Sequence, residues 1–204
     1  MSRPAVFLIL LAALVGFVVS QYLPYGNWLA LGIASFVGVL CIFWQPKTQN
    51  GDRTKPVNIW RRFLAFCIDY QVSLAGSIGL ILTMSVCAAL LFTGRLRGPE
   101  EVLELLQSTG GNIFVGMGVW VSFLGYFWVH KRLQRSTLGQ YVMGYKTMDS
   151  TDASDAQRYL LGMFAGYVAL ATVVFWGWFV KEADTFNGEY WWDRVGGTRA
   201  VALF

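Results

Sequence analysis

The chain has 204 residues, of which 55% are hydrophobic and only 14% are charged, with a formal net charge of +4 at pH 7. A soluble domain carries about 25% charged residues, so this composition excludes an ordinary soluble protein. No basic pattern interleaved with stacking aromatics is present, which argues against nucleic acid as a partner. The fold class that we expect is an all-α polytopic membrane protein, a helical bundle.

Five long apolar blocks run along the chain, and a transmembrane helix needs roughly 20 such residues. The blocks are Pro4–Leu23, Trp28–Trp44, Phe63–Phe92, Ile113–Val129 and Tyr159–Val180. The first block follows Arg3 and has features of a secretory signal, but no small-residue cleavage site follows it. We therefore expect a retained first span, which forms an N-terminal transmembrane hairpin over residues 1–50 with the second block.

The cysteines and the single histidine do not form a metal-binding pattern. Cys41, Cys67 and Cys87 lie inside apolar blocks without CxxC spacing, so we expect them to act as small hydrophobic residues. His130 is the only histidine, which argues against a zinc site or a histidine relay. No nucleophile–base pair is visible either. We predict no cofactor, no metal and no enzymatic activity.

The basic residues alternate between connections and predict the topology. The connections over residues 45–62 and 130–158 are rich in Lys and Arg, residues 21–27 are uncharged, and residues 94–112 carry three Glu against two Arg. Lys and Arg collect on the cytoplasmic side of membrane proteins. We therefore expect the N-terminus and the two basic connections in the cytoplasm.

Three basic residues at the start of the fourth connection are candidate lipid contacts. Lys131, Arg132 and Arg135 would attract anionic headgroups, because basic side chains near a membrane surface are drawn to them. Alternatively, these residues serve only the positive-inside topology. The lipid bilayer is a predicted partner in both cases.

Small residues recur every four positions within several blocks, as in Ala12/Gly16/Ser20, Ala30/Ala34/Gly38, Gly118/Ser122 and Gly162/Gly166. Such rows allow two helix backbones to approach closely in lipid. They predict either the internal packing of one bundle or a docking face for another subunit.

The third connection contains a short helical pattern. In Pro99–Gln107, a proline at the first helical position is followed by Glu100 and Glu101, which is typical of a helix start. Val102, Leu105 and Leu106 form one apolar edge. We expect an amphipathic helix that rests on the outer membrane interface.

The stretch RRFLAFCIDY, residues 61–70, places charged residues at the start of an apolar block. Arg62, Ala65 and Asp69 are spaced so that they share one helix face. An ionisable residue inside a span is costly and normally faces a partner in the bundle. The candidate partners of Asp69 are Arg62, Arg194 and Arg199. The pair would serve either as a structural anchor or in ion or proton handling.

Three stretches in order resemble the RDD family of bacterial membrane proteins, over about residues 56–204. They are RRFLAFCID, residues 61–69, STLGQYVMGYKTMDS, residues 136–150, and WWDRVGGTRAV, residues 191–201. The residues that give the family its name would here be Arg62, Asp69 and Asp193. Two features depart from the family pattern: the acidic stretch KEADTFNGEY, residues 181–190, and Trp191–Trp192 beside Asp193. The resemblance implies a bacterial inner-membrane protein and suggests cation/proton exchange.

The loop and the tail of this RDD-like region are both prone to form strands. Residues 137–148 and 198–204 could pair as a small two-stranded ribbon, which would bring Asp193 and Arg194 near Asp69. This pairing conflicts with a single crossing by Tyr159–Val180, which would place the tail on the opposite side. A re-entrant or hairpin arrangement of that block resolves the conflict, and a full-length span favours the crossing.

Two functions follow from these observations. The first is a non-catalytic subunit or scaffold of a larger membrane assembly, with other membrane subunits or further copies as partners. The second is a small-ion transporter in which Asp69 binds the proton or cation and Arg62 and Asp193 tune it.

Overall fold

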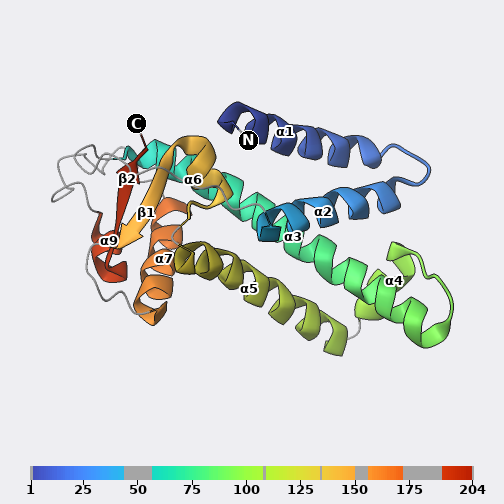
Figure 1. Cartoon of the computed structure of the whole chain (residues 1–204). Helices are drawn as coiled ribbons and strands as arrows, with labels where there is room; N and C mark the ends of the chain where they lie inside the picture. Colours follow the sequence, from blue (N-terminus) through green and yellow to red (C-terminus); the bar gives the residue numbers. More distant parts are fainter. Residues whose placement is uncertain are drawn as a thin grey trace. The chain divides into compact units, whose positions relative to one another are not determined.

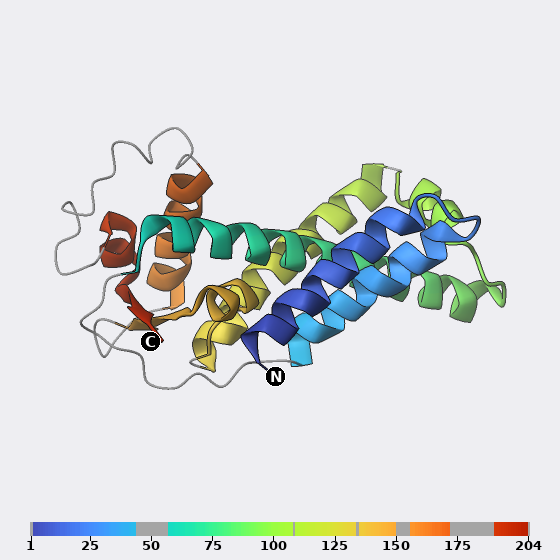
Figure 2. The same cartoon turned by 90° about the horizontal axis from the view of Figure 1, so that it is seen from above.

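The computed structural model describes residues 2–43, 57–107, 109–133, 135–149, 156–171 and 190–203, and its helices and strands are shown in Figures 1 and 2. The chain forms two compact units. The first comprises Met1–Trp44 and Gln71–Tyr126, and the second comprises Gln45–Tyr70 and Phe127–Phe204. Two helices, α3 (Ile59–Thr93) and α5 (Thr109–Arg132), contribute residues to both units.

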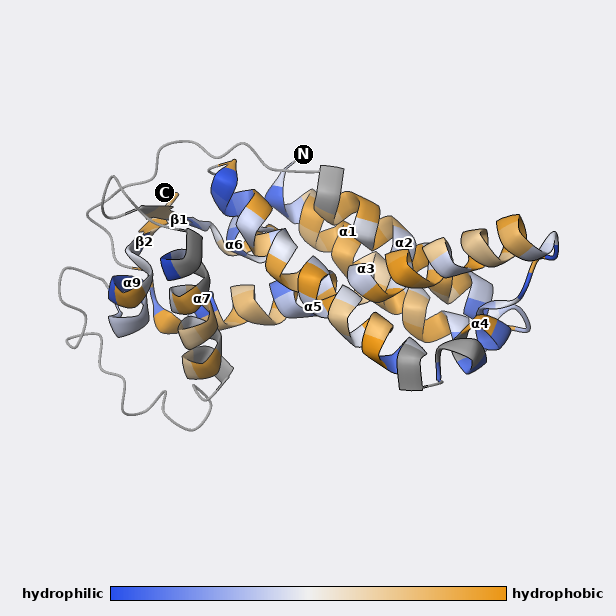
Figure 3. Cartoon of the chain, turned by 90° about the horizontal axis from the view of Figure 1, so that it is seen from below, coloured by the Kyte–Doolittle hydropathy of each residue, from blue (hydrophilic) through white to orange (hydrophobic). Residues whose placement is uncertain are grey.

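Long apolar helices dominate the first unit. In the part of the chain that the structure describes, three helices are long and apolar enough to cross a membrane: Arg3–Ser20, which is α1, Ile59–Thr93, which is α3, and Gly111–Arg132 within α5. The helix α2 (Gly26–Phe43) is apolar over the shorter stretch Gly26–Cys41. Figure 3 shows the hydrophobic colouring along these helices. The prediction of a helical, polytopic membrane protein is confirmed.

A row of small residues on α2 packs inside the first unit, as the first of the two alternatives predicted. A Cβ added at Gly38 would lie 2.7 Å from the carbonyl oxygen of Gly76 on α3. The Ser35 hydroxyl hydrogen-bonds with the Thr83 hydroxyl at 2.7 Å and donates to the Gly79 carbonyl at 3.2 Å. Close backbone approach and hydroxyl bonds are the usual means of joining helices in lipid.

The short acidic helix forms where it was predicted, as α4 (Pro99–Leu106). Val102 is only 3% exposed and packs with Leu31 and Val86, while the position of α4 on the outer membrane interface stays a prediction. The Asn27 side chain also hydrogen-bonds Glu100. Val102 therefore faces α2 and α3, where an apolar side chain gains dispersion contacts from closely packed neighbours.

The second unit contains the predicted ribbon. The strand β1 (Tyr145–Asp149) pairs antiparallel with β2 (Thr198–Ala202), with Tyr145 opposite Ala202 and Asp149 opposite Thr198. This pairing confirms the ribbon but corrects its extent, since β1 includes only the last part of residues 137–148, from Tyr145 onward. The residues before it form α6 (Leu138–Met143).

A short helix and a glycine precede each strand. The Thr137 hydroxyl accepts from the Gln140 N–H and the Gln140 side chain accepts from the Thr137 N–H, so a capping box starts α6. Gly144 ends that helix with φ of 76°, and Gly197, with φ of 62°, ends α9 (Trp191–Gly196). Glycine accepts this left-handed conformation without steric cost, so the chain can turn directly from helix to strand.

The ribbon also bears on the two predicted paths of the Tyr159–Val180 block. The first part of this block lies in α7 (Ala156–Ala171), and residues 172–180 lie outside the described residues. Asp149 before the block and Thr198 after it are register partners in the ribbon. A segment whose flanking residues pair in one ribbon is expected to begin and end on the same side, so this pairing favours the return over the single crossing.

We predict that Gly38→Leu destabilises the first unit by about 1–3 kcal/mol, because the larger side chain overpacks the contact with α3. The matched control is Gly32→Leu on the same helix, since no atom lies within 4 Å of a Cβ added there. Thermal unfolding of the purified protein in detergent measures both. Equal melting temperatures for the two variants would contradict the packing described here.

Candidate functional site

A buried ion pair joins the start of α3 to α9. Arg62 Nη1 lies 2.7 Å from Asp193 Oδ2, and the two side chains are 4% and 7% exposed. Asp193 Oδ2 also accepts the Tyr190 N–H at 3.1 Å, and the Arg62 guanidinium stacks 4.5 Å above the centre of the Tyr190 ring. Removing one member of a buried pair leaves an uncompensated charge, so each charge here depends on the other.

The helix α9 that carries Asp193 is held in place by α7. A Cβ added at Gly162 would lie 2.3 Å from the Cα of Gly196, so the two helices approach with backbone contact. Arg158 donates to the carbonyl oxygens of Arg194 and Val195 at 3.1 and 3.0 Å. Two carbonyls at the end of α9 are thereby satisfied by a cation, which also suits the helix dipole.

Asp69, two turns further along α3, holds the start of α6. Its carboxylate accepts the Thr137 hydroxyl at 2.6 Å and the Gly139 N–H at 2.8 Å, and the residue is 2% exposed. A Cβ at Gly139 would lie 2.1 Å from the Ala65 carbonyl oxygen, so only glycine fits. As predicted, the small Ala65 leaves room for another element, and that element is α6.

The predicted contact of Asp69 with one of three candidate arginines, Arg62, Arg194 and Arg199, stays a prediction. The Arg194 side chain is exposed rather than part of the buried cluster. Arg62 forms an ion pair with Asp193. Helix geometry explains this outcome. A residue seven positions away on the same helix is two turns distant, whereas α9 brings Asp193 directly to the guanidinium.

Arg61, which the sequence analysis did not single out, binds the end of α6. Its Nη2 donates to the Met143 carbonyl at 2.6 Å and to the Gly144 carbonyl at 3.1 Å, and its Nε donates to Met143 at 3.0 Å. Because Asp69 binds the start of this helix and Arg61 binds its end, α6 is held at both poles with charges that match its dipole.

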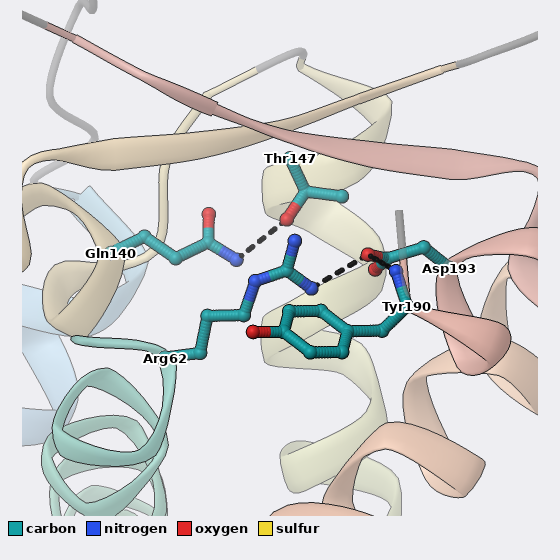
Figure 4. A network of polar contacts seen from close by, with 5 residues as sticks. All are labelled: Arg62, Gln140, Thr147, Tyr190 and Asp193. Atoms are coloured by element: carbon teal, nitrogen blue, oxygen red, sulfur yellow. Dashed lines mark hydrogen bonds and ion pairs between the residues drawn. The ribbon is translucent and has the colours of Figure 1, made fainter. Parts of the chain in front are cut away.

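The three predicted signature residues line one cavity of about 80 Å³. Gln140 and Thr147 are also in its wall, and the Gln140 side-chain nitrogen donates to the Thr147 hydroxyl at 3.1 Å. Figure 4 shows the Arg62 guanidinium between this pair and the Tyr190 ring. Burial raises the pKa of the Tyr145 hydroxyl in the same wall, so this phenol stays neutral near pH 7.

The basic residues at the end of α5 have different surroundings. Arg132 is exposed, and the Lys131 ammonium lies 4.8 Å from the centre of the Tyr159 ring. Arg135 is partly buried, and its backbone N–H donates to the backbone carbonyl of His130. Within the described residues, no group of three or more His, Cys, Asp or Glu side chains is placed to hold a metal ion.

A model of the RDD family matches residues 56–197, which include all of this cluster. The chain belongs to the RDD family. No curated protein and no solved structure matches it. The residues assigned to the RDD signature are therefore brought together from distant parts of the sequence, with Arg62 and Asp193 in direct contact. The Trp192 that departs from the RDD pattern stacks on Tyr190 at 4.6 Å and so supports the ring beneath Arg62.

The sequence analysis missed several residues of the RDD site. Thr137 and Gln140 carried a detectable signal, because Thr-x-x-Gln is a capping-box pattern. Tyr190 and Thr147 carried none, since their positions beside Arg62 depend on the tail and the ribbon.

We predict that Arg62→Leu destabilises the protein by about 3–5 kcal/mol, because it leaves Asp193 buried and unpaired. Adding Asp193→Asn should recover part of this loss, since asparagine removes the charge and still accepts the Tyr190 N–H. Thermal unfolding in detergent measures both variants. The control, Arg132→Leu, removes an exposed charge and should shift stability by no more than about 0.5 kcal/mol. A double variant less stable than Arg62→Leu would contradict the pairing.

Proposed function

We propose that this protein is a non-catalytic subunit of a larger membrane assembly, and that a helix of a partner subunit docks beside α3. The alternating basic connections support a location in the bacterial cytoplasmic membrane with the N-terminus in the cytoplasm. The internal use of the signature residues supports a structural role, because Asp69, Arg62 and Asp193 all stabilise contacts within the chain.

The observation that carries this proposal is an amide in an apolar groove. The groove, with a volume of about 330 Å³, is formed by α1, α2 and α3 within the first unit. Gln71 is its one polar lining residue among Leu, Ile, Val, Ala and Phe side chains. Its side chain is exposed.

An exposed amide on a membrane span is costly in lipid, because acyl chains offer no hydrogen bond. Glutamine side chains in spans hydrogen-bond across helices, and each such bond contributes about 0.6–2 kcal/mol. The groove supplies apolar contact area around this one polar group. A partner helix that is apolar, with one hydrogen-bonding side chain facing Gln71, matches both features. Lipid acyl chains would match the apolar groove but would offer no hydrogen bond to Gln71.

The test is site-specific photo-crosslinking in native membranes. We predict that a photoreactive amino acid in place of Leu14, which lines the groove and is 61% exposed, gives one discrete protein adduct. The adduct should be lost with Gln71→Leu and kept with Met84→Leu, an exposed position on α3 outside the groove. A probe in place of Leu91, also exposed and outside the groove, is the position control.

Three outcomes would count against a partner subunit. Adducts of lipid alone would mean that acyl chains fill the groove. An adduct of twice the chain mass would replace the partner subunit with a second copy of this chain. A protein adduct that is unchanged by Gln71→Leu would remove the amide from the contact.

Ion transport is the second candidate function, and the observation that favours it is the cavity lined by Asp69 and Asp193. Against it, both oxygens of Asp69 already accept hydrogen bonds from α6 and its cap. We predict no cation/proton exchange by the purified protein in proteoliposomes. Exchange that is lost with Asp69→Asn and kept with Glu104→Gln, an exposed acid of α4, would favour transport instead.

A further inference from the structure

One edge of the Arg62 guanidinium is buried and has no hydrogen-bond partner among the described residues. Nη1 binds Asp193, but Nε and Nη2 are buried and meet no hydrogen-bond partner among the described residues. The side chain is 4% exposed, so bulk water does not cover these donors. Buried donors in native proteins are nearly always satisfied, by protein, water or ligand. An unsatisfied pair on a charged group therefore indicates that something else binds there.

The surroundings fix the direction in which this edge can bind. The face of the guanidinium is covered by the Tyr190 ring at 4.5 Å, and one end is held by Asp193. In Figure 4 the remaining edge faces the Gln140 side-chain nitrogen and the Thr147 hydroxyl across the cavity. Gln140 uses one N–H on Thr147, and an amide nitrogen carries a second. Guanidinium and amide donors thus converge on one space.

The donor pattern matches a carboxylate. Nε–H and Nη2–H point in parallel, and this fork binds the two oxygens of a planar acceptor side-on. The cavity of about 80 Å³ limits the size of the ligand. One water needs about 10–15 Å³ of such space, so there is room for a group of only a few heavy atoms.

The charges around the cavity restrict the ligand further. Arg62 and Asp193 neutralise each other, and Asp69 adds a negative charge to the same wall. A simple anion would be repelled by Asp69, whereas a ligand with an ammonium group beside its carboxylate would offset that charge. The hydroxyls of Tyr145 and Tyr159 in the wall are neutral and do not alter this balance.

We propose that this cavity binds a small zwitterionic amino acid, with its carboxylate on the Nε/Nη2 edge of Arg62 and its ammonium group toward Asp69. The site lies wholly in the second unit and is independent of the groove at Gln71. Binding of the amino acid in this cavity does not require the partner subunit that we propose at Gln71.

The experiment is titration of the full-length protein in detergent with glycine and with acetate, followed by calorimetry and thermal unfolding. We expect saturable binding of glycine that raises the melting temperature, and binding of acetate at least tenfold weaker. Arg62→Lys keeps a cation for Asp193 but loses the fork, and should weaken glycine binding at least tenfold. Gln140→Leu leaves the ion pair intact and should weaken binding several-fold, even where Arg62→Lys fails to fold.

Arg132→Gln removes an exposed charge and is the control for general electrostatic effects, so its affinity should equal that of the wild type. The absence of saturable glycine binding by folded wild-type protein would overturn the proposal and leave water as the occupant. Equal affinity in wild type and Gln140→Leu would also overturn it. Acetate binding as tight as glycine would overturn the role given to Asp69.

Discussion

Two charged residues on one helix face hold the second unit together. Arg62 binds α9 through Asp193, and Asp69 binds α6 through Thr137 and Gly139. The contacts differ in kind, since the first is an ion pair and the second is a carboxylate at a helix start. Both are buried, where a missing partner is far more costly than at a surface. The start of α3 is therefore the element on which α6, α9 and the ribbon between them depend.

The same local design is used twice around this helix. In each case a six-residue helix ends at a left-handed glycine and leads directly into a strand, as α6 into β1 and α9 into β2. The two strands then pair, so the ribbon ties together the two helices that α3 holds separately. This arrangement explains how three short motifs, widely spaced in the sequence, form one site with few residues.

The two units use polar groups in different ways. In the first unit, hydroxyls and small residues join apolar helices, and Gln71 is an amide in an otherwise apolar groove. In the second unit, charges and hydrogen bonds surround a small cavity, and two buried donors of Arg62 have no hydrogen-bond partner among the described residues. This RDD protein thus combines a unit of long apolar helices with a unit that holds a buried polar cluster, and substitutions can test the two separately.

The sequence by itself determined the membrane class, the helical spans and the short acidic helix. It also identified Arg62, Asp69 and Asp193 as the residues that match the RDD signature. Apolar block length and local spacing carry that information, because a span and a helix start are set by nearby residues. Only the tertiary structure decided that Arg62 pairs with Asp193, that Asp69 holds α6, and that the tail returns to pair with the loop. Those contacts join residues more than 45 positions apart, and no local pattern specifies which of several arginines a buried carboxylate will meet.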